Sequence, residues 1–325
     1  MQKLRLIPLL FTAGVIFCGC RADESSAAPA VTAERTEPSS VTETTTESET
    51  TTTETTTTAP RIRNLVTLGD SISAGYGLDR PETQRYSALL TQKLAEADQL
   101  SWNDFNYAVS GDDSSDLLKL LQEQKAEHLK EADLICLYIG ANNLLGPYTD
   151  YLKSFTAIFQ KPDSDSGAIG WIGKIAGALE NNVKSFQSIQ EKVDAGMSRL
   201  SSDLPATYNL IREQNADAPI YLLTVYHPYA KVSVENPVTK ENFGAYSGEK
   251  INRLNEIIKS FAASHPDIRI VDIYSEFEKC ETVPVLGNIN EGVSKDKKVN
   301  VDPHPNPDGQ KLIAEAVFAA VRGAG

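Results

Sequence analysis

From residue 61 onward, short apolar runs alternate with longer stretches in which apolar residues recur at helical spacing. The runs with the length of strands are Asn64–Leu68, Phe105–Val109, Asp133–Ile139, Pro219–Tyr226 and Ile268–Ile273. The stretches with helical spacing are Thr83–Ala97, Ser115–Gln124, Asp194–Glu213, Ser247–Ser264 and Pro307–Val321. Apolar strands separated by helices are typical of a parallel sheet that helices cover on both faces. We therefore expect one α/β domain over residues 61–325.

Two long segments interrupt this alternation. Residues 144–204 separate the third predicted strand from the fourth, and residues 231–248 follow the fourth. Both leave the sheet at the carboxyl ends of its strands, where ligands of parallel sheets bind. We expect these inserts to form walls or a lid over a site. The alternative is extra helical packing without a role in binding.

The first 20 residues have the pattern of an export signal. A basic start at Lys3 and Arg5 precedes an apolar run that is too short to span a bilayer and ends in Cys18-Gly19-Cys20. A small residue before a cysteine resembles the bacterial lipobox, in which that cysteine is lipidated and becomes the new N-terminus. We expect Cys20 to anchor an exported lipoprotein at the outer face of the cell membrane. The alternative is an ordinary cleaved signal and an extracellular protein.

Residues 21–60 have the composition of a tether. Fourteen of these residues are Thr, five are Ser and eight are acidic, so the segment has too little apolar surface to offset the entropy cost of folding. The whole chain carries a formal net charge of −13. That charge argues against a nucleic-acid partner and against electrostatic binding to anionic lipid. We therefore expect contact with the membrane only through the lipid anchor.

The two remaining cysteines, Cys136 and Cys280, do not lie in nucleophile motifs. Cys136 lies within an apolar run, so we expect a small buried hydrophobe there. Two cysteines alone do not establish a disulfide. No cluster of His, Cys and Asp has the spacing of a metal site, and we expect a reaction without a metal or another cofactor.

A serine follows the first predicted strand in Gly69-Asp70-Ser71. A serine at the carboxyl end of a strand can present its hydroxyl to a ligand while its own N–H stays available. An acyl-transfer nucleophile needs both of these features. Alone, this tripeptide is a common turn, and three later segments change that interpretation.

Each later segment ends a core element with a residue type that ester hydrolysis uses. Gly111 follows the second strand, the amide of Asn142 follows the third, and His304 directly precedes the last helix. A Ser–His pair, a backbone N–H and a side-chain amide form a complete set for cleaving an ester.

The four segments resemble, in this order, the sequence blocks of the SGNH or GDSL-type hydrolases. The resemblance covers residues 64–325 apart from the inserts. It is nearest to secreted lipases and esterases of Gram-positive bacteria, partly through Tyr226-His227-Pro228 after the fourth strand. It implies a three-layer αβα sandwich with a five-stranded parallel sheet in flavodoxin-like order.

The same resemblance implies a role for each of the four residues. Ser71 corresponds to the nucleophile and His304 to its base. The oxyanion hole corresponds to the backbone N–H groups of Ser71 and Gly111 and the side-chain amide of Asn142.

Two positions depart from the family pattern. The third block usually ends in Asn-Asp, and here Asn143 follows Asn142. The fifth block usually has Asp three residues before the His, a position that Val301 occupies, and the nearest carboxylate is Asp302. We expect Asp302 to orient His304. The alternative is that a backbone carbonyl near Val301 bonds the ring while Asp302 lies at the surface.

Other polar residues near these blocks have simpler interpretations. Asp70 and Asp112 are expected to bond local backbone. His227 lies near the expected cleft, and we favour a structural histidine with satisfied hydrogen bonds over a substrate contact. His128 and His265 lie in polar surroundings, which predicts surface positions.

The sequence therefore predicts a serine ester hydrolase that acts through an acyl-enzyme. The rival class is a surface-displayed binding protein with little turnover, which Asn143 and the displaced Asp302 favour. Reaction with a serine-reactive organophosphorus reagent separates the two. The substrate stays open among small acyl esters, acylated polysaccharides and lysolipids, and the oligomeric state stays open as well.

Overall fold

Five short strands form one parallel sheet in the computed structural model of the chain. They are β1 (Arg63–Gly69), β2 (Trp102–Asn106), β3 (Leu134–Tyr138), β4 (Ile220–Leu223) and β5 (Ile268–Val271). Neighbouring strands pair in the order β2-β1-β3-β4-β5, and every pair is parallel. All residues of β3 and β4 are buried, as expected for apolar strands between two helical layers. The predicted α/β sandwich with flavodoxin-like strand order is confirmed.

The described part of the chain has several gaps. The structure describes residues 62–144, 168–233, 240, 242–291 and 300–323, with side chains of the longest helix described from Ile189 onward. The predicted signal sequence with Cys20 and the predicted tether lie outside these ranges, so both stay predictions. Parts of both predicted inserts lie outside them as well. Within these ranges, no helix is both long and apolar enough to cross a membrane.

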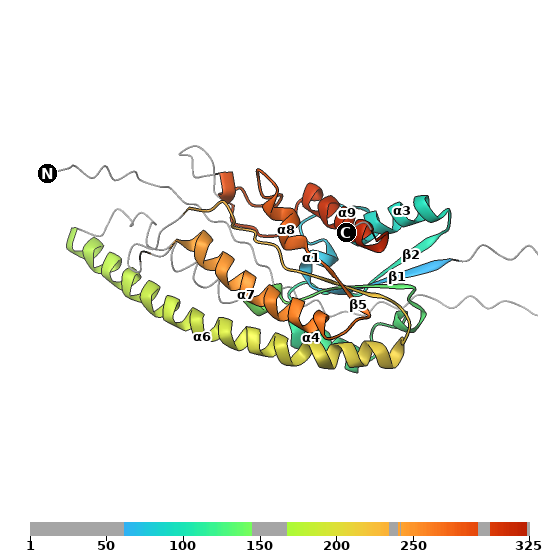
Figure 1. Cartoon of the computed structure of the whole chain (residues 1–325). Helices are drawn as coiled ribbons and strands as arrows, with labels where there is room; N and C mark the ends of the chain where they lie inside the picture. Colours follow the sequence, from blue (N-terminus) through green and yellow to red (C-terminus); the bar gives the residue numbers. More distant parts are fainter. Residues whose placement is uncertain (1–61, 145–167, 234–239, 241, 292–299, 324–325) are drawn as a thin grey trace, which may run out of the picture. The chain divides into compact units, whose positions relative to one another are not determined.

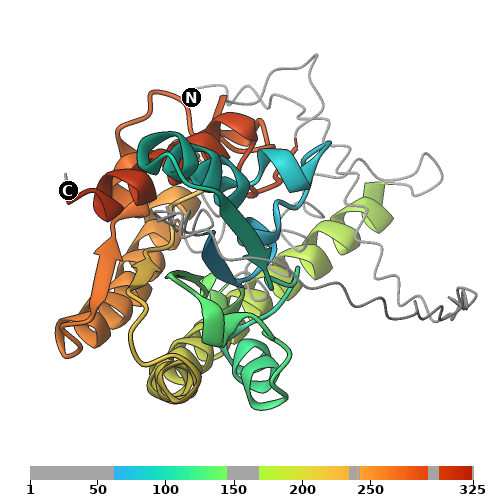
Figure 2. The same cartoon turned by 90° about the vertical axis from the view of Figure 1, so that its right-hand side faces the viewer.

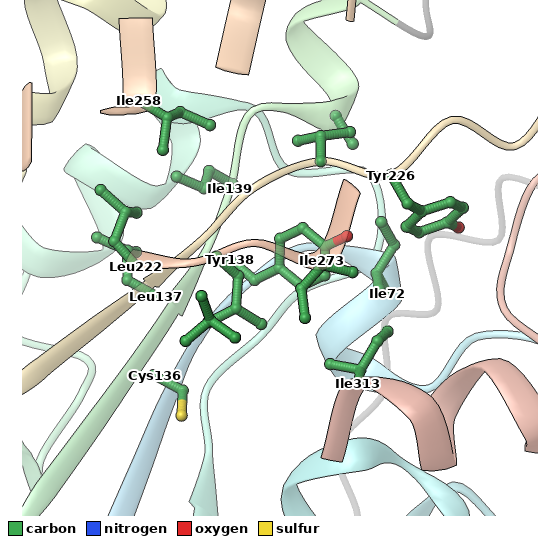
Figure 3. Close-up of a cluster of buried hydrophobic side chains, with 14 of the residues drawn as sticks. Ile72, Cys136, Leu137, Tyr138, Ile139, Leu222, Tyr226, Ile258, Ile273 and Ile313 are labelled. Atoms are coloured by element: carbon green, nitrogen blue, oxygen red, sulfur yellow. The ribbon is translucent and has the colours of Figure 1, made fainter. Parts of the chain in front are cut away.

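Helices cover both faces of the sheet, as Figures 1 and 2 show. On one face lie α3 (Tyr86–Asp98), α8 (Ile273–Glu278) and α9 (Pro307–Val321). On the other face lie α4 (Ser114–Gln122), α6 (Ala168–Gln214) and α7 (Phe243–Ala263). The shorter elements are α1 (Ser71–Ala74), α2 (Pro81–Gln84), η1 (Leu129–Glu131) and η2 (Ile289–Glu291). Figure 3 shows buried side chains on both sides of β3, among them Ile258 of α7 and Ile313 of α9.

The second strand lies three residues earlier than the predicted Phe105–Val109. β2 is an edge strand and contains Asp104 and two asparagines. It therefore has no continuous apolar run by which the sequence could place it. Beyond β2, the N–H groups of Tyr107 and Val109 still donate to carbonyls of β1 at 2.9 and 3.1 Å. The chain therefore stays beside β1 as far as the turn that carries Ser71.

Two predicted helices have different limits in the structure. The helix predicted over Thr83–Ala97 is divided at Arg85, whose extended backbone separates α2 from α3. The helix predicted to begin at Asp194 is the end of α6, which already begins at Ala168 within the predicted insert.

Side-chain caps explain where two other helices begin. α7 begins at Phe243, earlier than predicted, because the side chain of Asn242 accepts a hydrogen bond of 3.0 Å from the N–H of Ala245. α9 begins at Pro307 as predicted. There, Asn306 accepts from the N–H of Gly309 at 3.0 Å.

The contact between α6 and the end of β3 depends on a glycine. A Cβ atom on Gly196 would lie 2.0 Å from the carbonyl oxygen of Asn143. In addition, the Asn143 amide donates to the carbonyl of Gly196 at 3.0 Å. The helix therefore approaches the backbone beside Asn142 more closely than any side chain would allow.

Because of this close approach, replacing Gly196 with alanine should lower the stability of the protein instead of raising it. In an exposed helix, Gly→Ala stabilises by about 1 kcal/mol. Here Gly196→Ala is expected to destabilise by about 1–3 kcal/mol, because the added methyl group overlaps backbone. Urea unfolding measures the change. Ser198→Ala, an exposed position of the same helix, is the control and should stay within about 0.5 kcal/mol of the wild type. A Gly196→Ala protein more stable than the wild type would contradict the described contact.

Candidate active site

The four sequence blocks gather at the carboxyl edge of the sheet. Ser71 follows β1, Gly111 follows β2 and Asn142 follows β3, while His304 precedes α9. β1 and β3 are neighbours at the point where the strand order reverses. Ligands of doubly wound sheets bind at that point.

The turn that carries Ser71 is fixed by its neighbours. A Cβ atom on Gly69 would lie 2.4 Å from the carbonyl oxygen of Tyr138, so only glycine fits between β1 and β3 here. Asp70 caps α1, since its Oδ1 accepts a hydrogen bond of 2.9 Å from the N–H of Ile72. Ser71 therefore begins a single helical turn, which the sequence analysis did not predict. Its N–H occupies a position without an acceptor inside the helix.

Three side chains form one hydrogen-bonded chain. His304 Nε2 lies 2.9 Å from Ser71 Oγ, and His304 Nδ1 lies 2.7 Å from Asp302 Oδ1. With the ring proton on Nδ1, the imidazole donates to the carboxylate and accepts from the serine hydroxyl. Ser71 is 6% exposed and His304 is 7% exposed, so water competes little for these bonds. This is the arrangement of a serine nucleophile with its base and an orienting acid.

Asp302 reaches the ring although it is displaced by one residue from the family position. Its Oδ1 also accepts the N–H of His304 at 3.0 Å, so the carboxylate folds back over Pro303 in an Asx-turn. The carbonyl of Val301, the alternative partner, instead accepts from Tyr229 Oη at 3.2 Å. Burial alone would raise the pKa of the Asp302 carboxyl, but its hydrogen bonds to His304 hold that pKa below its usual range. The carboxylate is therefore ionised at neutral pH.

The loop before α9 is held on its backbone by a segment that the sequence analysis did not select. The N–H groups of Leu286 and Gly287 donate to the carbonyls of His304 and Asp302, at 2.8 and 2.9 Å. Nothing in the pattern of Leu286 and Gly287 distinguishes them from an ordinary loop, so this contact could not be predicted.

Aromatic residues hold the same loop from two sides. Tyr226 Oη donates to the carbonyl of Pro303 at 2.6 Å, and the ring of Tyr76 packs on the His304 ring with centroids 4.5 Å apart. Tyr226 belongs to the Tyr-His-Pro sequence noted after the fourth strand. That resemblance was the one available signal for its position.

The three expected oxyanion donors lie on adjacent strand ends. Gly111 has φ of 95°, a left-handed conformation that favours glycine. Asn142 Nδ2 donates one hydrogen to the carbonyl of Asp112 at 2.8 Å, which places the amide beside Gly111. The amide has a second hydrogen for a ligand. Together with the N–H of Ser71 these groups can serve an ester oxygen, and that role stays a prediction.

Asn143, where the family usually has Asp, lies in a buried network. Its Nδ2 donates to Ser114 Oγ at 2.9 Å and to the carbonyl of Gly196 at 3.0 Å, while its Oδ1 accepts the N–H of Ser114 at 3.2 Å. A carboxylate could not donate the first two bonds. The amide therefore suits this position and fixes the residue next to Asn142.

The carboxyl group of Asp70 has an unusually buried position in the site. Its side chain is fully buried, and Oδ2 has no hydrogen-bond partner within the described part of the chain. This burial raises the pKa of Asp70 to about 7, although the N–H of Ile72 and nearby His304 lower it. The expected bond to local backbone is confirmed for Asp70, and its second oxygen has no partner among the described residues.

The other three histidines each have partners within the protein. His227 is buried, its Nε2 lies 3.0 Å from Ser247 Oγ, and burial lowers its pKa to about 4. His128 and His265, predicted at the surface, are each partly exposed and partly packed on aromatic rings. His128 stacks on Phe105 with ring centroids 3.6 Å apart. A partner this far away in sequence leaves no local pattern that would predict the contact.

The cysteines agree with the expectation from the sequence. Cys136 is fully buried in the core and Cys280 is half-buried, and both are free thiols. Among the residues with described positions, no group of three or more His, Cys, Asp or Glu could hold a metal ion.

The hydrogen-bonded chain of Asp302, His304 and Ser71 lies at the switch point of a doubly wound parallel sheet, in the geometry that serine hydrolases use. The model of the GDSL-like lipase/acylhydrolase family matches residues 67–312. This match covers most of the chain, and the protein belongs to that family.

One curated relative and two solved structures extend the comparison. "Uncharacterized protein YpmR" of Bacillus subtilis is 22% identical over 260 residues, 79% of this chain and 81% of the relative. The lipase Lip_vut3 from a goat rumen metagenome has a TM-score of 0.54 and 20% identity, over 79% of this chain and 97% of its own. Phospholipase A1 from Streptomyces albidoflavus has a TM-score of 0.52 and 21% identity, over 82% of this chain and 100% of its own. At these identities, the solved structures show a shared fold.

The buried carboxyl of Asp70 predicts a pH dependence of stability. Its pKa of about 7 lies above the ordinary value of 3.8, so between these values the folded protein binds more protons than the unfolded chain. The free energy of unfolding should therefore fall as pH rises from about 4 to about 7. Asp70→Asn can still accept the N–H of Ile72 but cannot ionise, so this fall should be reduced by on the order of 1 kcal/mol or more. Urea unfolding from pH 4.5 to 8 measures both proteins, and parallel pH profiles would refute the assignment.

Proposed function

We propose that this protein is a serine ester hydrolase that cleaves carboxylic esters through an acyl-enzyme on Ser71. The observation that carries the proposal is the continuous chain from Asp302 through His304 to Ser71, with hydrogen bonds of 2.7 and 2.9 Å. Membership of a lipase/acylhydrolase family supports ester hydrolysis in general.

In the first half-reaction, Ser71 Oγ attacks the ester carbonyl while its proton moves to His304 Nε2. The ionised Asp302 stabilises the imidazolium that forms. His304 then gives the proton to the leaving alcohol, and the acyl group stays on Ser71. In the second half-reaction, water gives its proton to His304 and attacks the acyl-enzyme, which releases the carboxylic acid and restores Ser71.

The negative charge of each tetrahedral intermediate needs donors that are already in position. The N–H groups of Ser71 and Gly111 and the amide of Asn142 are assigned this role. Loss of one such donor typically lowers the rate by about 10²–10³. The tie from Asn142 to the Asp112 carbonyl restricts the amide before substrate arrives.

A binding protein without turnover is the second candidate. Two features of the sequence favour it, Asn143 and the displaced Asp302. Both have structural explanations that are compatible with catalysis, because Asn143 has partners for its amide and Asp302 contacts the ring. The hydrolase is therefore the better-supported proposal.

The proposal also includes export and lipid anchoring, which rest on the sequence pattern of the first 20 residues alone. If Cys20 carries the lipid, Cys20→Ala should move the protein from the membrane fraction to the medium or leave its precursor unprocessed. Cell fractionation and immunoblotting measure this, and an unchanged distribution would count against the anchor.

Two substitutions test the catalytic roles. Ser71→Ala should lower kcat/KM on p-nitrophenyl acetate to below about one thousandth of the wild-type value, because the nucleophile is lost. Asp302→Asn should lower kcat by about 10²–10⁴, because the amide cannot stabilise the imidazolium. Steady-state kinetics measure both, and circular dichroism checks folding.

Ser73→Ala is the matched control. Ser73 lies on the same helical turn, and its hydroxyl is directed to Tyr86 Oη at 3.2 Å instead of His304. This variant should keep most of the activity. A Ser71→Ala protein that retains more than a few per cent of the wild-type rate would exclude Ser71 as nucleophile.

A further inference from the structure

An apolar cavity lies beside the proposed catalytic residues. Its volume is about 30 Å³, counted as the space in which the centre of a water-sized group can lie. The walls come from the exits of β1, β3 and β4, from α7 and from the loop before α9. Among the lining residues are Ile72, Leu144, Val225, Ile251 and His304, and Ile72 is drawn in Figure 3.

The cavity borders three parts of the proposed machinery. Ile72 directly follows the nucleophile Ser71, Ala141 directly precedes the oxyanion residue Asn142, and His304 is the base itself. Of the three catalytic groups, His304 itself lines the cavity, and Ser71 and Asn142 are each next in sequence to a residue that lines it. A group attached to the carbonyl carbon on Ser71 therefore has this cavity next to it.

Among the described lining residues, His304 is the one polar side chain that is not already bonded to backbone. Tyr226 Oη and Tyr229 Oη already donate to the carbonyls of Pro303 and Val301. Ser247 Oγ lies 2.8 Å from the carbonyl of Phe243, its own helix. Hydroxyl groups of a sugar would find no partner here, whereas a hydrocarbon chain loses nothing.

Ser247, one of the lining residues, is held by a side chain behind it. Ser247 is fully buried, and its hydroxyl meets the ring of His227 at 3.0 Å. A Cβ atom on Gly248 would lie 3.0 Å from that ring, so His227 fits tightly against α7. Since one water-sized group needs about 10–15 Å³ on this measure, the cavity has room for about two or three such groups.

His304 is more open on the side where Tyr76 packs on its ring. Tyr76, which packs on the His304 ring, is 39% exposed, and Val109 after β2 is 45% exposed. A large alcohol can therefore lie at the open side, while only a small group fits the enclosed side.

We propose that this cavity binds the acyl chain of the substrate and limits it to short acyl groups, of about two to four carbons. The inference rests on the proposed function and assigns its substrate class: esters of short-chain acids with an alcohol of any size. Ile251 and Ser247 lie one turn apart on α7 and set the depth of the cavity.

The test is a chain-length profile. kcat/KM is measured on p-nitrophenyl acetate, butyrate, hexanoate and octanoate for the wild type and for Ile251→Ala. The wild type should prefer acetate or butyrate over octanoate by at least about tenfold, since one excess methylene in a filled pocket costs about 10-fold or more. Ile251→Ala enlarges the cavity and should raise the ratio of octanoate to acetate by about tenfold.

Ile258→Ala is the matched control. Ile258 lies two turns further along α7, is fully buried, and does not line the cavity. It loses the same side-chain volume, so its profile should equal that of the wild type. Ile251→Val and Ile258→Val form a milder pair if either alanine variant does not fold.

A second series keeps the acetyl group and lengthens the alcohol, with methyl, butyl and hexyl acetate. Ile251→Ala should leave these ratios unchanged. If Ile251→Ala changes the alcohol preference instead of the acyl preference, the cavity holds the alcohol and the proposal is overturned. An unchanged acyl profile in Ile251→Ala, or a wild type that prefers octanoate, also overturns it and leaves ester hydrolysis intact. A folded wild type that cleaves no ester in either series removes the proposed function as well.

Discussion

The hydrogen bonds of Asp302 to His304 are the interaction on which the site depends. One carboxylate oxygen accepts both the backbone N–H and the ring of His304, at 3.0 and 2.7 Å. The ring is thereby fixed in position and tautomer, and its other nitrogen meets Ser71 at 2.9 Å. The turn from Asp302 to His304 is made by residues two positions apart and forms locally. The rest of the fold therefore only has to hold this turn in the right place. The contacts of Tyr226 and Leu286 with the loop backbone provide that position.

A second constraint is the close approach of backbone at the edge of the sheet. Gly69 brings β1 against β3, and Gly196 brings α6 against Asn143. The first contact holds the segment of Ser71 against β3, and the second holds the residue next to Asn142 against α6. Next to Gly69, Asp70 is fully buried, and its Oδ2 has no hydrogen-bond partner among the described residues. Burial raises the pKa of Asp70 to about 7, because the charged carboxylate is costly to bury.

Much of the fold was predictable from the sequence because apolar runs and helical spacing report burial directly. The parallel sheet and the cap at Asn306 follow from local patterns, whereas the strand order and the roles of the four block residues came from the family resemblance. β2 was placed three residues late because an edge strand has no continuous apolar run. The contact of Asp302 with the ring was only one of two outcomes, since spacing alone does not fix an Asx-turn. The loop at Leu286 and the cavity beside His304 depend on tertiary packing and leave no local pattern.

Covalent labelling of Ser71 tests the central claim most directly. A fluorophosphonate reacts with an activated serine and stays attached, so intact-mass and peptide mass spectrometry can locate it. The account predicts one adduct per chain, on the peptide that contains Ser71, and a reaction slower by orders of magnitude in His304→Ala. A folded wild-type protein that forms no adduct, or an adduct on another residue, would contradict the account.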